Sequence, residues 1–160
     1  MARDSASSDV GTRVDLLQLE AEYARTWDTQ DARGWAGCFT SDGAFEMGST
    51  ANGPSMRFAG ADELEAFCRL GSGRYEGIHL LSPPHLTIDG DTARGWVHFS
   101  YFDRDRKTEQ VRQVVGVYAV SYARSEAGWK MALRREQAVY SAGTFHGFPS
   151  EARMWADELS

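Results

Sequence analysis

The sequence predicts an α+β fold in which helices gathered in the first half of the chain pack on a curled mixed or antiparallel sheet, forming a cone-shaped barrel. Two observations predict it. Apolar residues recur at helical spacing before residue 70, and from residue 75 onward they alternate with a period of two. Because the helices precede the long strands instead of alternating with them, the sheet is expected to curl around the helices and leave a cone-shaped cavity.

Residues 13–30 carry the first helical pattern. When each residue is placed 100° on from the last, Tyr23 and Trp27 fall on the apolar side, and Asp28 falls at the margin of that side. An aspartate in this place is either a surface or capping residue or a carboxylate that faces a cavity. Glu20 also falls among the apolar residues, which makes it a rival carboxylate.

Shorter elements follow this helix. Asp31 is placed to cap a short helix that runs through Phe39, and two short strands are expected on either side of Asn52 and Gly53. A further helix is predicted over residues 60–70, ended by Gly71 and Gly73.

Four long segments then alternate as strands, with Pro83 and Pro84 interrupting the first of them. They are residues 78–89, 92–105, 110–125 and 128–141. Residues 12–142 are therefore expected to form one domain. Residues 1–11 are expected to be a disordered leader, and residues 143–160 a tail with a short amphipathic helix around Glu151–Leu159.

Composition excludes several classes of function. The formal net charge of −6 disfavours both nucleic-acid binding and an anionic membrane surface, and no apolar run is long enough to span a bilayer. Cys38 and Cys68 lack metal-site spacing and are expected to be reduced core thiols in a cytoplasmic protein. The four histidines form no metal-binding pattern, so no metal is expected.

Alternation along residues 92–105 places Tyr101 and Asp103 on one face, which we expect to look into the cavity; Asp103 as a turn residue is the alternative. Val117 is a candidate for the pocket wall. Arg134 and Arg135 lie on opposite faces of the last strand, and alternation groups Arg135 with the apolar residues before it.

Three local patterns give the chain a family resemblance over about residues 12–142. They are Tyr23 and Asp28 at the end of the first helix, His79 at the start of the first long strand, and the closing strand "GWKMALRRE". The chain resembles the ketosteroid isomerase and nuclear transport factor two-like superfamily, in its dehydratase-like, polyketide-cyclase-like branch.

The resemblance implies a catalytic dyad in the cavity, in which His79 removes a proton from carbon and Asp28 orients it. It also implies that Tyr23 donates a hydrogen bond, that Asp103 is a further acid, and that Arg134 rather than Arg135 reaches the substrate. A histidine suits this role because its ordinary pKa lies near neutral pH.

The sequence therefore predicts a cofactor-independent lyase or isomerase that acts on an apolar cyclic or polyketide-like small molecule. Asp28 and His79 are the predicted catalytic residues, and the predicted substrate contacts are Tyr23, Trp27, Tyr101, Asp103, Val117 and Arg134. The alternatives are a cyclase or epoxide-opening enzyme that uses Asp28 as its acid, and a non-catalytic small-molecule-binding protein. Members of this fold are usually dimers, so a homodimer or higher homo-oligomer is expected.

Overall fold

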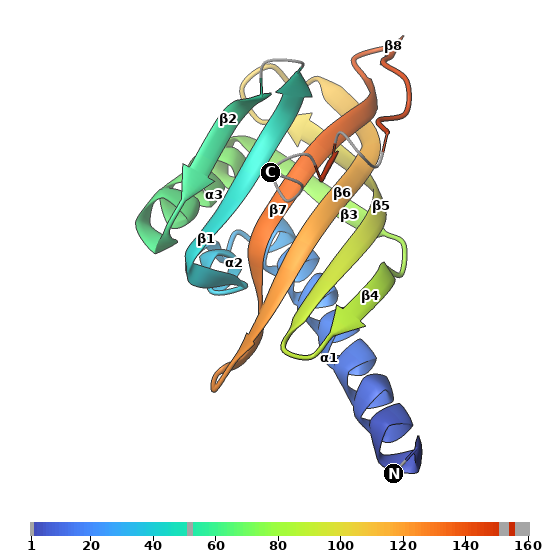
Figure 1. Cartoon of the computed structure of the whole chain (residues 1–160). Coiled ribbons are helices and arrows are strands. Elements are labelled where there is room, and N and C mark those ends of the chain that lie inside the picture. Colours follow the sequence, from blue (N-terminus) through green and yellow to red (C-terminus); the bar gives the residue numbers. More distant parts are fainter. Residues whose placement is uncertain (1, 51–52, 151–153, 156–160) are drawn as a thin grey trace.

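The computed structural model describes residues 2–50, 53–150 and 154–155. Three helices lie against one face of a single curled sheet (Figure 1), and Met154 and Trp155 pack on the other face. This is the α+β cone that the sequence predicts. None of the helices in the described residues is long and apolar enough to cross a membrane.

The helical layer consists of α1 (Ala2–Asp28), α2 (Ala32–Ala36) and α3 (Ala61–Arg74). The expected disordered leader is wrong for residues 2–11, which form the first turns of α1 and project past the sheet in Figure 1. Extending an existing helix costs far less than starting one, and the segment contains no proline. Arg13 also forms an ion pair with Asp9, one turn earlier, at 3.2 Å.

The sheet runs in the order β2-β1-β7-β6-β5-β3, with β4 paired to β5 and β8 paired to β7. Its strands are β1 (Phe39–Thr50), β2 (Gly53–Ala59), β3 (Tyr75–Leu81), β4 (His85–Asp89), β5 (Thr92–Asp105), β6 (Val111–Ser125), β7 (Gly128–Ser141) and β8 (Thr144–Phe145). Most neighbours are antiparallel, but β1 pairs with β7 in parallel. The break at Pro83 and Pro84 separates β3 from β4, as expected, and both then pair with β5.

A β-bulge in β7 decides which of its side chains point inward. Ser121 pairs with Leu133 and Tyr122 pairs with Met131, so Ala132 is an extra residue on the β7 side. An extra residue reverses the inside–outside alternation beyond it. Met131 and Arg134 therefore lie on the same side of the sheet although they are three positions apart.

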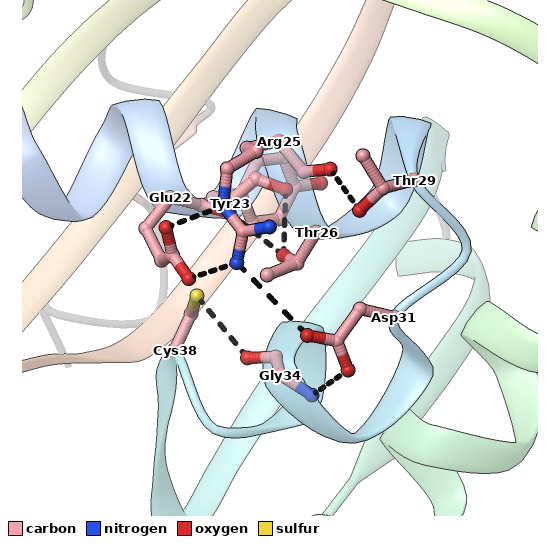
Figure 2. A network of polar contacts seen from close by, with 8 residues as sticks. All are labelled: Glu22, Tyr23, Arg25, Thr26, Thr29, Asp31, Gly34 and Cys38. Atoms are coloured by element: carbon pink, nitrogen blue, oxygen red, sulfur yellow. Dashed lines mark hydrogen bonds and ion pairs between the residues drawn. The ribbon is translucent and has the colours of Figure 1, made fainter.

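The end of α1 is held by a polar network (Figure 2). Asp31 caps α2, as expected, through its side-chain Oδ1, which accepts a hydrogen bond from the Gly34 amide at 2.9 Å. Arg25 binds Glu22 at 2.5 Å and approaches Asp31 at 4.0 Å. Thr26 donates to the Glu22 carbonyl at 2.7 Å. This network fixes the last turn of α1, which carries the candidate site residues.

The outer face of the sheet is partly covered by Met154 and Trp155. Met154 is fully buried against Val117 and Ala119, with Trp96 and Trp155 beside them. The expected wall position of Val117 is therefore wrong, since its side chain points away from the concave face. Most of the tail helix expected around Glu151–Leu159 lies outside the described residues.

Candidate active site

A cavity of about 370 Å³ opens between the helices and the concave face of the sheet. Its wall is mainly apolar and aromatic, with a few ionisable groups, as is typical of small-molecule sites. The lining residues are Tyr23, Trp27, Phe45, Met47, Met56, Phe67, Gly71, Tyr75, His79, Phe99, Tyr101, Asp103, Arg112, Val114, Tyr118 and Glu136.

Asp28 and His79 meet at the edge of this cavity. The Nδ1 atom of His79 lies 2.7 Å from Oδ1 of Asp28, and the backbone amide of His79 donates to Oδ2 at 2.9 Å. Asp28 and His79 are 51 residues apart in sequence, and both carboxylate oxygens of Asp28 contact His79. This arrangement places the Nδ1 hydrogen toward Asp28 and leaves Nε2 for the cavity that His79 lines.

The His79 side chain is almost fully buried, with 6% of its surface exposed. Burial lowers the pKa of His79 below its ordinary value, although the hydrogen bond and charge of Asp28 act in the opposite direction. The imidazole therefore stays neutral down to a lower pH than a free histidine. A neutral ring with its free nitrogen in an apolar cavity is equipped to accept a proton.

Three aromatic residues expected at the site surround this imidazole. Tyr101 stacks on His79 with ring centres 4.3 Å apart, and Tyr23 and Trp27 meet it edge-on at 6.1 and 6.2 Å. The Tyr101 hydroxyl accepts a hydrogen bond from the Trp27 indole at 3.1 Å. Burial raises the pKa of Tyr101 to about 12, so its phenol keeps a proton that it can donate.

Asp103 faces the cavity, as expected, and is not a turn residue because it lies within β5. Its carboxylate is already engaged. Arg112 binds both Asp103 oxygens, at 2.8 and 2.9 Å, and the same guanidinium lies 3.8 Å from the centre of the Tyr75 ring. The sequence reasoning missed Arg112. Asp103 therefore holds Arg112 at the cavity wall, whereas the resemblance implied that Asp103 is a further acid.

Arg134 lies on the inner side of the sheet, but the expectation that it reaches the substrate is wrong. It is absent from the residues that line the described cavity. Its Nη1 atom binds both carboxylate oxygens of Glu20 at 2.8 Å, and the guanidinium is held between Tyr23 and Tyr118 at 3.9 and 3.8 Å from the ring centres. Glu20, the rival carboxylate, therefore neutralises a buried cation beneath the site.

Arg135 points to the outer face, as the resemblance implied and simple alternation did not. Its Nε atom donates to Glu46 at 2.7 Å, and its Nη1 donates to the backbone carbonyl of Met154. The bulge at Ala132 explains why alternation failed. Arg135 secures the end of the chain against the sheet and is remote from the cavity.

A model of the SnoaL-like domain matches residues 8–135, which is most of the chain. The protein belongs to the SnoaL-like domain family. This family lies within the nuclear transport factor two-like superfamily that the sequence resembles. No curated protein is similar enough in sequence to add to this comparison.

Solved structures share the cone of this SnoaL-like chain. A putative scytalone dehydratase from Novosphingobium aromaticivorans superimposes with a TM-score of 0.78 at 14% identity, covering 91% of this chain and 97% of its own. A hexachlorocyclohexane dehydrochlorinase gives 0.72 at 15% identity, covering 89% and 95%. A protein of unknown function from Mycobacterium tuberculosis gives 0.71 at 26% identity, covering 86% and 76%.

Gly71 shows how closely the SnoaL-like helices approach at the cavity. The sequence predicts that this glycine ends the third helix, but α3 continues to Arg74. A Cβ atom at Gly71 would lie 2.8 Å from the indole of Trp27. The glycine is needed for close packing against the site rather than for a helix end.

Glu136 is a second ionisable residue in the cavity that the sequence reasoning missed. It lies two positions beyond Arg134 on β7, so both share the inner face. Once Arg134 was assigned inward, the same alternation could have found Glu136. Among the described residues, no group of three or more His, Cys, Asp or Glu side chains is placed to hold a metal ion.

Proposed function

We propose that this protein is a cofactor-independent lyase or isomerase that removes a proton from a carbon next to a carbonyl group in an apolar small molecule. His79 is the base and Asp28 holds it in the correct tautomer. The observation that carries the proposal is the 2.7 Å contact between His79 Nδ1 and Asp28 Oδ1 at the wall of an apolar cavity.

The surroundings of the dyad suit this chemistry. As His79 takes the proton, an imidazolium forms beside the Asp28 carboxylate, which stabilises it. The negative charge that develops on the carbonyl oxygen needs a hydrogen-bond donor in the same apolar space. Tyr101 can supply that donor, because its oxygen already accepts from Trp27 and its proton remains available. A putative scytalone dehydratase and a hexachlorocyclohexane dehydrochlorinase that share the fold support an elimination.

The arrangement favours His79 as the proton-transfer residue over the alternative in which Asp28 is the acid. Both oxygens of Asp28 are occupied by the backbone and ring of His79. Asp28 is also absent from the residues that line the described cavity. A substrate in this space would therefore meet the imidazole before the carboxylate.

Hydrogen–deuterium exchange tests the proposal without knowledge of the natural substrate. The protein is incubated in D₂O with 4-phenylbutan-2-one or 1-tetralone, two apolar ketones, and loss of the signal from the protons beside the carbonyl is followed by NMR. We expect catalysed exchange, and we expect His79→Gln to slow it by about 100-fold or more, the usual contribution of a general base.

His98→Gln is the matched control. His98 is exposed on the outer face of β5, so this variant should exchange protons at the wild-type rate. If neither ketone exchanges faster than in buffer, the protein does not remove protons from such carbons. If His79→Gln exchanges as fast as wild type, another residue is the base.

The exchange rate should also depend on pH in one direction. Protonation of His79 removes the base, and burial lowers the pKa of this group below 6.5. The rate should therefore be constant near neutral pH and fall only on the acid side, with its midpoint below 6.5. A midpoint above 6.5 would contradict a buried imidazole as the base.

A further inference from the structure

Glu136 reaches the cavity from the side opposite to the dyad. It lies on β7 and pairs across the sheet with Tyr118 on β6, whereas His79 lies on β3 at the far end of the strand order. His79 and Glu136 both line the cavity, and the Tyr23 ring lies 6.1 Å from the ring of His79 and 6.0 Å from the ring of Tyr118, the cross-strand neighbour of Glu136. A small molecule in this space would have the imidazole at one end and the Glu136 carboxyl at the other.

The carboxyl of Glu136 has no counter-charge of its own. Among the described residues no lysine or arginine forms an ion pair with it, since the nearby Arg134 binds Glu20. Its hydrogen-bond partner is Tyr118. Tyr23 from α1 also lines the cavity, and Glu20 from the same helix is the ion-pair partner of Arg134 beneath it.

Burial raises the pKa of Glu136 to about 7, although the charge of Arg134 and the hydrogen bond with Tyr118 act to lower it. Much of the protein therefore carries a protonated Glu136 at neutral pH. A protonated carboxyl group can donate a proton. The neutral imidazole of His79 is the base in the same step, so it cannot also be the donor. Two groups whose surroundings separate their protonation states are typical of an acid and base pair.

We propose that Glu136 is the general acid of an elimination and protonates an oxygen leaving group. This inference rests on the proposed role of His79. The substrate class is then a ketone that carries a hydroxyl group on the carbon next to the activated carbon, that is, a β-hydroxy ketone. A halide leaves as a stable anion and would need no such acid.

The step balances without any further reactant. His79 Nε2 takes the proton from the carbon beside the carbonyl, and the electron pair of that C–H bond forms the new C=C bond. The C–O bond breaks, and its electron pair and the proton of Glu136 leave together as water. The protein is left with a His79 imidazolium and a Glu136 carboxylate. Transfer of one proton from the imidazolium to the carboxylate through solvent restores the starting state.

Two substrates of similar size that yield the same product test the proposal. They are 4-hydroxy-4-phenylbutan-2-one and 4-chloro-4-phenylbutan-2-one, and both give the same conjugated enone, which is followed by its ultraviolet absorbance. In Glu136→Gln, which keeps the size and polarity of the side chain, we expect the ratio of water loss to chloride loss to fall by about 100-fold. In wild type, water loss should also decline as the pH rises above about 7, where Glu136 gives up its proton.

Glu126→Gln, in the exposed turn between β6 and β7, is the control and should keep the wild-type ratio. If Glu136→Gln slows both substrates equally, Glu136 is not the acid, whereas ketone exchange that still depends on His79 would leave the proposed function intact. If wild type exchanges no ketone protons, the proposed function fails and this inference fails with it. A thermal melt that matches wild type excludes misfolding of Glu136→Gln as the cause.

Discussion

Replacing Asp28 with asparagine is expected to slow ketone proton exchange by about 100-fold or more, as replacing His79 does, because an amide in place of the orienting acid leaves the base in the wrong tautomer. Asp28 accepts two hydrogen bonds, from the ring and the backbone amide of His79. An asparagine has only one carbonyl oxygen, so when that oxygen accepts from the backbone amide its NH₂ group must face Nδ1. The imidazole hydrogen then moves to Nε2, and the nitrogen that faces the cavity can no longer take a proton.

Nitrogen NMR of the His79 ring shows directly which of its two nitrogen atoms carries the hydrogen. We expect the wild-type ring to carry its hydrogen on Nδ1 and the Asp28→Asn ring to carry it on Nε2. Asp31→Asn is the matched control, three residues away in the same stretch. Asparagine caps a helix as well as aspartate does, so α2 and the exchange rate should be retained. An Asp28→Asn rate within tenfold of wild type would mean that Asp28 does not orient the base.

Replacing Glu20 with glutamine is expected to lower the free energy of unfolding by about 3–5 kcal/mol, as when one partner of a buried ion pair is removed. Arg134 is fully buried, and Glu20 is its ion-pair partner. Tyr122 also donates to Glu20 at 2.6 Å. Glutamine keeps the size of the side chain and an oxygen for Tyr122, so the loss comes mainly from the uncompensated charge of Arg134.

Urea unfolding of Glu20→Gln and Glu22→Gln measures this effect on one helix. Glu22 pairs with Arg25 at 2.5 Å, but both side chains are substantially exposed, with 41% and 53% of their surfaces accessible. Solvent screens such a pair, so Glu22→Gln should cost about 1 kcal/mol or less. Equal losses in the two variants would show that burial adds nothing to the Glu20–Arg134 pair. A double change of Glu20 and Arg134 to methionine should recover much of the stability, because it removes both charges.

The sequence determined most elements of the fold and, through a family resemblance, the contact of Asp28 with His79. Helical and strand periods differ enough to be read directly, and Pro83 and Pro84 mark the break between β3 and β4. The inward face of β5 could also be assigned, because Tyr101 and Asp103 follow the alternation of an unbroken strand. The contact between Asp28 and His79 was expected from a family resemblance. Periodicity could not supply it, because no period connects a helix to a strand 51 residues away.

Only the tertiary structure decided how the charged residues are used. Arg134 is close to the cavity yet occupied by Glu20, and Asp103 is occupied by Arg112. Each of these pairs joins elements far apart or on different strands, so local patterns give no sign of them. One extra residue at Ala132 also reverses the faces of β7, and this bulge appears only when β6 is aligned beside it.

For a related reason, the sequence could not predict which β6 side chains point to the outer face of the sheet. The central part of β6 is apolar at consecutive positions, so alternation could not say whether Val117 or Tyr118 faces the cavity. One face of β6 belongs to the main core and the cavity wall, and the other face packs against Met154. A strand buried on both faces loses the contrast between polar and apolar residues from which its orientation is read. The sequence therefore determines which segments pair and curl, whereas tertiary packing decides which side chains are left for chemistry.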